Sequence, residues 1–203
     1  MSKGMVIIVE GVPGCGKTSF CRSYLKQNKD AVIMEEWVDV NLLSKYISNM
    51  EEYAFEFQCR AQTETLKNIE LALQYASEGK TVLIDRGVVG NECFAEIQHE
   101  SGFISDEELK EYKALSSNID ATMFKTCYLK CDAEVALRRI SNRGRNGESS
   151  YTINYLQKLV EKHDLKLAQI RRAIVIDVNQ EELSTSQDFL QTPVRELETI
   201  LVM

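Results

Sequence analysis

The sequence lacks an apolar run long enough to cross a membrane or to form the core of a secretion signal. The first apolar run, Met5 to Val9, ends at the charged residue Glu10. A bilayer requires about 20 apolar residues, and a signal peptide requires an apolar core of about 7 to 15. An arginine-rich transit segment is also missing. We therefore expect a cytoplasmic protein that has no membrane partner.

The sequence also lacks C-x-x-C pairs and contains only two histidines. A zinc site or a disulfide framework normally requires such clustered ligands. The six cysteines are instead spread along the chain, at Cys15, Cys21, Cys59, Cys93, Cys127 and Cys131. This pattern is typical of reduced thiols in a cytosol-like compartment.

Basic residues are fewer than acidic ones, with 24 lysines and arginines against 31 aspartates and glutamates and a formal net charge of −7. Proteins that bind a nucleic-acid backbone usually present a basic surface, so we expect no nucleic-acid partner. Internal repeats, low-complexity tracts and domain linkers are absent as well. With 203 residues, 44% of them hydrophobic and 27% charged, the chain is predicted to form a single domain over residues 1–203.

A glycine-rich turn follows the first apolar run. Gly11, Gly16, Lys17 and Thr18 satisfy the pattern G-x-x-x-x-G-K-[ST] of a phosphate-binding loop. The apolar run before it reads as a buried strand and residues 19–27 read as a helix, which is the setting that the loop requires. We therefore predict that ATP or GTP binds here. The residues expected to contact the nucleotide are Gly11, Val12, Pro13, Gly14, Cys15, Gly16, Lys17 and Thr18.

Short apolar runs alternate with helical periodicity along the rest of the chain, which predicts a five-stranded parallel sheet with helices on both faces. The other four strands are expected at residues 31–34, 81–84, 124–129 and 173–176. The expected helices are residues 40–50, 52–77, 88–98, 106–117 with Asp106 as cap, 133–141, 152–170 and 192–201. The predicted apolar stripe of the longest helix is Phe55, Phe57, Ala61, Leu66, Ile69 and Leu73. Residues 180–191 read as a polar loop.

Acidic residues follow two of these strands. Glu35, Glu36 and Trp37 follow the second strand, and Asp85 and Arg86 follow the third. In a parallel sheet with helical crossovers, ligands bind at the carboxyl ends of the strands. We expect Asp85 and the hydroxyl of Thr18 to hold Mg²⁺ beside the phosphates.

An arginine-rich stretch follows the helix at residues 133–141. Arg139 and Arg143 lie one helical turn apart, and Arg145 follows across Gly144. Because guanidinium groups suit phosphate oxygens, residues 139–151 are predicted to form a lid over the triphosphate. A solvated basic loop and a nucleic-acid contact are the alternatives.

Together these motifs resemble the deoxynucleoside kinase family, which includes deoxycytidine, deoxyguanosine and mitochondrial-type thymidine kinases. The resemblance extends from the phosphate loop to about His163. Glu35-Glu36-Trp37 is similar to a shortened form of the family's Glu-Pro-x-x-x-Trp, and Asp85-Arg86-Gly87 to its Asp/Glu-Arg-Ser. The remaining motifs are Val40-Asn41-Leu42-Leu43, Phe57-Gln58, the lid pattern of Arg139, Arg143, Arg145 and Glu148, and a following helix with Ile153, Tyr155, Leu156 and His163.

The resemblance implies transfer of the γ-phosphate of ATP, or of another nucleoside triphosphate, to the 5′-hydroxyl of a deoxynucleoside. Glu35 is the expected general base because it directly follows the strand, and Glu36 is the alternative. Arg86, Lys17 and the lid arginines Arg139, Arg143 and Arg145 would complete the catalytic set. The implied nucleoside contacts are Trp37, Phe57, Gln58, Ala61 and Asn91, with Glu148 and either Tyr46 or Ile47 at the 3′-hydroxyl of the sugar.

Ala61, Thr65 and Asn91 leave the preferred base open. The resemblance also suggests a homodimer.

Two other functions remain alternatives. A nucleoside monophosphate kinase of the thymidylate kinase type shares the loop, the Asp-Arg strand end and an arginine lid. Its dianionic acceptor would meet Glu35 and Glu36, a repulsion of up to roughly several kcal/mol, so a neutral hydroxyl acceptor is favoured. A nucleotide-binding switch without an acceptor would have no need of Gln58 and Glu148.

Overall fold

A computed structural model of the chain describes residues 4–144, 151–179 and 191–202. Its five strands are all parallel and form one sheet in the order β2-β3-β1-β4-β5, as the alternating pattern predicts. The phosphate loop therefore follows the central strand. The strands are β1 (Met5–Glu10), β2 (Val32–Met34), β3 (Thr81–Asp85), β4 (Lys125–Lys130) and β5 (Ile174–Asp177).

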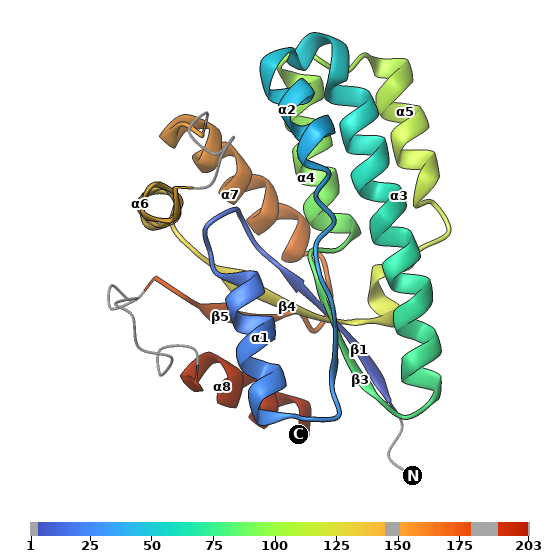
Figure 1. Cartoon of the computed structure of the whole chain (residues 1–203), viewed down its shortest axis with the longest axis vertical. Helices are drawn as coiled ribbons and strands as arrows, with labels where there is room; N and C mark the ends of the chain where they lie inside the picture. The colour runs from blue at the N-terminus through green and yellow to red at the C-terminus, as the bar shows by residue number, and fades with distance from the viewer. Residues whose placement is uncertain (1–3, 145–150, 180–190, 203) are drawn as a thin grey trace.

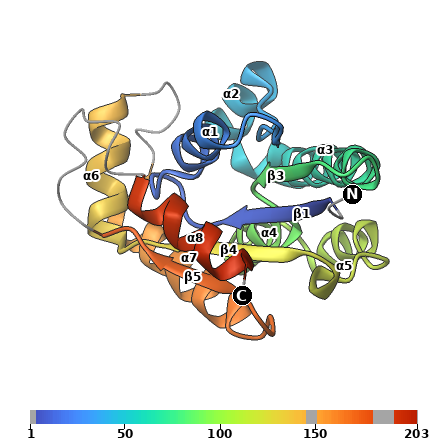
Figure 2. The same cartoon turned by 90° about the horizontal axis from the view of Figure 1, so that it is seen from below.

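Helices cover both faces of the sheet. Helices α1 and α8 pack together on one face, while α3, α4 and α7 form a layer on the other (Figures 1 and 2). The helices are α1 (Lys17–Gln27), α2 (Val40–Ser48), α3 (Met50–Ser77), α4 (Val88–Glu100), α5 (Asp106–Leu115), α6 (Ala133–Arg143), α7 (Ile153–Leu167) and α8 (Gln191–Val202). A 3₁₀ turn, η1 (Ala121–Met123), precedes β4. Within the described ranges, no helix is long and apolar enough to cross a membrane.

The core forms on both sides of β1. Alternate residues of a strand point to opposite faces, so Ile7 and Val9 join the cluster around Phe20 of α1, while Val6 and Ile8 join the cluster around Ile69 of α3. All of these side chains are almost fully buried. The packing on both faces fixes the carboxyl end of β1, where the phosphate loop begins.

The buried face of α3 differs from the predicted apolar stripe. The buried residues of this helix are Ala54, Gln58, Gln62, Thr65, Ile69 and Ala72. Leu73 is exposed instead, and Leu66 is only partly buried. The prediction was confirmed for Ile69 and in part for Phe55, Phe57 and Leu66, which pack partly buried against apolar clusters. It was wrong for Leu73, and it omitted the polar side chains that the middle of α3 turns toward α4.

The start of α5 also differs from expectation. Asp106 is the first residue of the helix, and the cap is Ser105. The Ser105 hydroxyl accepts the backbone N–H of Glu108, and the Glu108 carboxylate accepts the backbone N–H of Ser105 at 2.8 Å. This reciprocal arrangement is a capping box, which satisfies two backbone donors at once.

Residues that follow β1, β2 and β3 line one cavity together with residues of α2, α3 and α4. The residues that follow β1, β2 and β3 meet there because these three strands are neighbours in the sheet. Residues separated by more than 70 positions in the chain are thereby brought together at this end of the sheet.

Candidate active site

The phosphate loop folds as its glycines require. Gly16 has φ 100° and precedes α1, and Gly11 has φ 148°, both in a region that residues with a side chain rarely adopt. The ammonium group of Lys17 is buried and donates to the carbonyl oxygens of Gly11 at 2.9 Å and Val12 at 3.2 Å. The loop thus encloses a lysine and the start of a helix, a combination that attracts phosphate.

Thr18 and Asp85 meet across the strand ends. The Thr18 hydroxyl donates to Oδ2 of Asp85 at 2.5 Å. Asp85 is 2% exposed, and its Oδ1 has no hydrogen-bond partner in the described parts of the chain. Burial raises the pKa of Asp85, and Lys17 acts in the opposite direction. A hydroxyl and a buried carboxylate with a spare oxygen are ligands that suit Mg²⁺.

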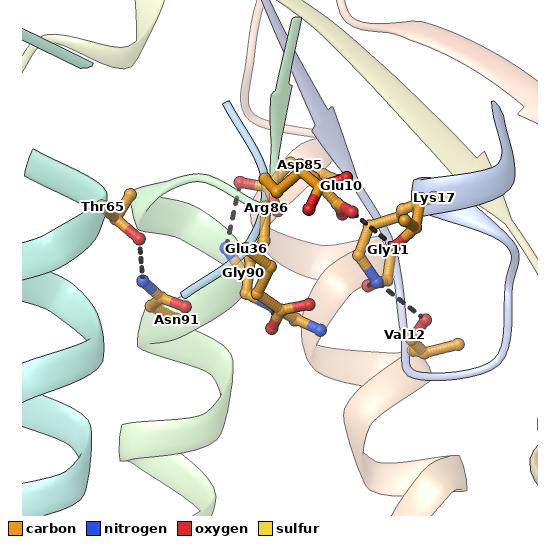
Figure 3. Close-up of polar contacts among 12 residues, drawn as sticks. Glu10, Gly11, Val12, Lys17, Glu36, Thr65, Asp85, Arg86, Gly90 and Asn91 are labelled. Atoms are coloured by element: carbon orange, nitrogen blue, oxygen red, sulfur yellow. Dashed lines mark hydrogen bonds and ion pairs between the residues drawn. The ribbon is translucent and has the colours of Figure 1, made fainter. Parts of the chain in front are cut away.

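Arg86 forms an ion pair with Glu36, in which Nε of Arg86 lies 2.6 Å from Oε1 of Glu36. The Arg86 side chain is only 7% exposed, and its guanidinium lies 4.7 Å from the ring centre of Phe94. Burial alone would lower the pKa of Arg86, but attraction to Glu36 and to Glu10 raises it above its ordinary value. The guanidinium is therefore a fixed positive charge beside the Glu36 carboxylate (Figure 3).

Glu35 lies elsewhere, which corrects its expected placement in the site. Its carboxylate pairs with Arg22 at 2.7 Å, and both side chains are more than half exposed. The two neighbouring side chains therefore take different directions, Glu35 toward Arg22 and Glu36 toward Arg86. Among the described residues, Glu36 lines the cavity and Glu35 does not.

One cavity of about 280 Å³ connects the phosphate loop with the space between α2, α3 and α4. Fourteen of the expected site residues line it, namely Pro13, Gly14, Gly16, Lys17, Thr18, Trp37, Tyr46, Ile47, Phe57, Gln58, Ala61, Arg86, Asn91 and Arg143. Its size is close to that of ordinary small-molecule pockets. Both predicted halves of the site thus belong to a single space.

Gln58 lies in the wall of this cavity beside stacked aromatic rings. It is 3% exposed. The rings of Tyr46 and Phe57 stack at a centroid distance of 4.7 Å, and Trp37 lies 6.4 Å from Phe57. Burial raises the pKa of Tyr46, while hydrogen bonds to Gln58 and Tyr155 act in the opposite direction. This part of the cavity offers flat apolar surfaces and one amide.

Asn91 contributes a second amide to the cavity. Its Nδ2 donates to Oγ1 of Thr65 at 2.9 Å (Figure 3). The same Nδ2 donates to Oε1 of Gln62 at 3.1 Å. Both amide hydrogens are therefore used within the protein. Thr65 and Asn91, two of the three residues that left the preferred base open in the sequence, are thus in direct contact.

The arginines of the arginine-rich stretch have different surroundings around the end of α6. Arg143 is the last residue of this helix and lines the cavity, and Gly144 ends the helix with φ 59°. Arg139 lies one turn earlier, where its Nη2 donates to the carbonyl oxygen of Val178 at 2.6 Å, and it does not line the cavity. Arg145 and Glu148, with most of the expected lid, lie outside the described residues.

Sequence reasoning missed several residues of the cavity. Phe94 and Gln98 line it one and two turns after Asn91 on α4. Tyr155, which the sequence placed in a motif but not in the site, lines it from α7, as does Tyr151 just before this helix. The spacings of three and four positions could have indicated these residues, because such residues share one face of a helix. The signal was weak because the same spacing describes any core-facing helix.

Comparisons with known proteins agree with this geometry. The family model "Deoxynucleoside kinase" matches residues 7–201. The chain is 29% identical to a probable deoxycytidine kinase of fowlpox virus, over 80% of this chain and 72% of that protein. It is 26% identical to a deoxyadenosine kinase of Dictyostelium discoideum, over 99% of this chain and 82% of that protein.

The same fold occurs in a solved structure of deoxyadenosine kinase from M. mycoides. The TM-score is 0.79 at 20% sequence identity, and the match covers 97% of this chain and 98% of that one.

Proposed function

Because the chain belongs to the deoxynucleoside kinase family, we propose that it transfers the γ-phosphate of ATP, or of another nucleoside triphosphate, to the 5′-hydroxyl of a deoxynucleoside. The observation that carries this proposal is the single cavity that joins the phosphate loop to the pocket around Gln58, with the Glu36–Arg86 pair between them. A donor and a neutral acceptor can therefore meet at one carboxylate.

In this reaction Glu36 is the general base. It accepts the proton of the 5′-hydroxyl as the oxygen attacks phosphorus, and Arg86 holds the carboxylate in place through its 2.6 Å contact. Lys17 and Arg143 neutralise the charge that spreads over the transferred phosphoryl group. We assign Arg139 and Arg145, like Arg143, to the proposed lid over the triphosphate.

Thr18 and Asp85 are the residues that would hold Mg²⁺. The metal ion, when bound, supplies positive charge that offsets the charge of the phosphates. The spare Oδ1 of Asp85 supports this assignment.

The nucleoside is placed by Gln58 and by the rings of Trp37, Phe57 and Phe94. A buried amide that pairs with the base selects strongly, because a base without the matching groups leaves the amide unpaired. Asn91 and Ala61 line the same wall. We assign the sugar contact to Tyr46, Ile47 and Glu148. The related M. mycoides enzyme is described with dCMP and a flexible dCDP bound, which supports a nucleoside of this class.

We further propose, from the family resemblance alone, a homodimer in the cytoplasm.

The test is transfer of labelled phosphate from ATP to each of the four deoxynucleosides and, separately, to their monophosphates. We expect labelled 5′-monophosphate from at least one deoxynucleoside. Labelling of monophosphates alone would favour the thymidylate kinase type, and labelling of neither class would overturn the proposal. Lys17→Ala is the control, because it removes the phosphate-binding ammonium group and should abolish transfer.

A further inference from the structure

Glu10 is a buried acidic residue for which the proposed reaction has no direct use. It ends the central strand and is 1% exposed. Its Oε1 accepts the backbone N–H of Gly90 at 3.1 Å, and its Oε2 has no hydrogen-bond partner in the described ranges. Burying a carboxyl group is costly unless its surroundings compensate. Its position therefore requires an explanation.

The carboxyl group lies at the first turn of α4. The N–H groups of a first turn have no partners within their own helix. The residue that caps α4, Gly87, has no side chain, and the first turn contains no acidic residue. Glu10 accepts hydrogen bonds from the backbone of Gly90 and of Gly87. A residue of β1 thus performs the capping role for a helix that begins 78 positions later, at Val88.

Two glycines make room for this contact. A Cβ atom on Gly90 would lie 2.4 Å from Oε2 of Glu10, and a Cβ on Gly87 would lie 2.9 Å from Oε1. Any larger residue at position 90 would displace the carboxyl group. The lack of a side chain at Gly90 therefore leaves the space that the Glu10 carboxyl group occupies at the first turn of α4 (Figure 3).

This turn controls the backbone of Arg86. Only Arg86 and Gly87 connect β3 to α4, and Arg86 has the unusual φ of 72°. The N–H of Arg86 donates to the carbonyl oxygen of Val9, next to Glu10, at 3.0 Å. A non-glycine residue at positive φ is strained and persists only where its surroundings hold it. The contact between Glu10 and Gly90 fixes the far end of this short connection.

We propose that Glu10 is a positioning residue: by accepting the Gly90 N–H, it fixes the first turn of α4 and thereby the Arg86 guanidinium that holds the base Glu36. Burial raises the pKa of Glu10, while the Gly90 amide and Arg86 act in the opposite direction, so the carboxyl group is electrostatically linked to the same arginine. This inference rests on the proposed kinase function.

The test compares Glu10→Leu with Glu10→Gln. The two side chains have similar volume, but only glutamine keeps an oxygen that can accept the Gly90 N–H. We expect Glu10→Leu to lower kcat by about 10- to 100-fold, with the nucleoside KM changed by less than about threefold. Glu10→Gln should recover most of the lost kcat. Ile7→Val, a core change in the same strand, controls for a general loss of stability.

A second variant keeps the test decisive where Glu10→Leu does not fold. Gly90→Ala pushes the carboxyl group away and should lower kcat in the same way. In the Glu10→Gln background its further effect on kcat should differ from that in wild type, because the two residues are in contact. Glu10→Leu lacks the oxygen that accepts the Gly90 N–H, so amide hydrogen exchange at Gly90 should be faster in this variant than in wild type. Exchange at Gly90 should not be faster in Ile7→Val.

A kcat of Glu10→Leu within threefold of wild type, or equal losses in Glu10→Leu and Ile7→Val, would overturn the positioning role. Absence of phosphate transfer in the wild-type protein would overturn the proposed function instead. The exchange rate at Gly90 does not depend on activity, so it separates these two outcomes.

Discussion

At the scale of single residues, neighbouring glutamates have different environments. Glu36 pairs with a nearly buried arginine, whereas Glu35 pairs with Arg22 in solvent. An exposed pair contributes little to stability or to positioning. A glutamate held by a buried guanidinium keeps one orientation, which a general base requires.

Glu36→Gln should therefore lower kcat by roughly 100- to 10,000-fold, because glutamine cannot accept the proton of the 5′-hydroxyl. Glu35→Gln, the matched control, should leave kcat within about twofold of wild type, since exposed ion pairs contribute little. Steady-state kinetics with a saturating nucleotide donor measure both. Equal losses in the two variants, or a loss confined to Glu35→Gln, would return the base to Glu35.

The sequence predicted the site only in part at this scale. The phosphate loop, Asp85, Arg86 and Gln58 could be located because each belongs to a recognisable motif or lies at the end of an apolar strand. The preference for Glu35 over Glu36 was not supported by the structure, because it depends on the direction that each side chain takes after β2. That direction is set by Arg86 and Arg22, which come from other elements.

At the scale of elements, all five strands and the main helices could be predicted from apolar runs and periodicity. The observed strand β3 includes Asp85, and α3 begins at Met50, two residues before the predicted start. Larger errors occurred where polar residues are buried, as on α3. Such residues are buried because a cavity and a facing helix supply their partners, and neither is visible in local sequence.

The capping box of α5 makes a prediction about helix stability. Ser105→Ala removes the hydroxyl that accepts the Glu108 N–H and should reduce the free energy of unfolding by about 1 kcal/mol. Asp106→Asn, which alters the exposed contact with His99, should cost less than about 0.5 kcal/mol. Urea unfolding of both variants measures the difference. A greater loss for Asp106→Asn would restore Asp106 as the residue that matters at this helix start.

At the scale of the whole molecule, a buried histidine couples folding to pH. His163 of α7 is fully buried, and its Nδ1 lies 2.7 Å from the carbonyl oxygen of Leu159. Burial lowers the pKa of His163 to about 3. The folded protein therefore keeps this ring neutral at a pH where an unfolded chain would protonate it.

The sign of the effect follows from this difference. The unfolded histidine takes up a proton as pH falls below about 6.5, while the folded one does not, so stability is lost from that pH down to the folded pKa. At pH 5.5 the loss should be about 1.4 kcal/mol relative to pH 8. His163→Gln should remove this part of the pH dependence. Urea unfolding at several pH values measures it, and an unchanged slope in the variant would contradict the assignment.

The order of strands in the sheet has a consequence for how the chain assembles. β3 lies between β2 and β1, so Val32 of β2 pairs with Val82, fifty positions later. During synthesis, β1 and β2 emerge long before β3. Neither strand can pair with β3 until α3, which lies between them in the sequence, has been synthesised. Such distant pairing slows folding and leaves strand edges exposed in the meantime. The hydrogen bond between Thr18 and Asp85 therefore cannot form until the first 85 residues have left the ribosome.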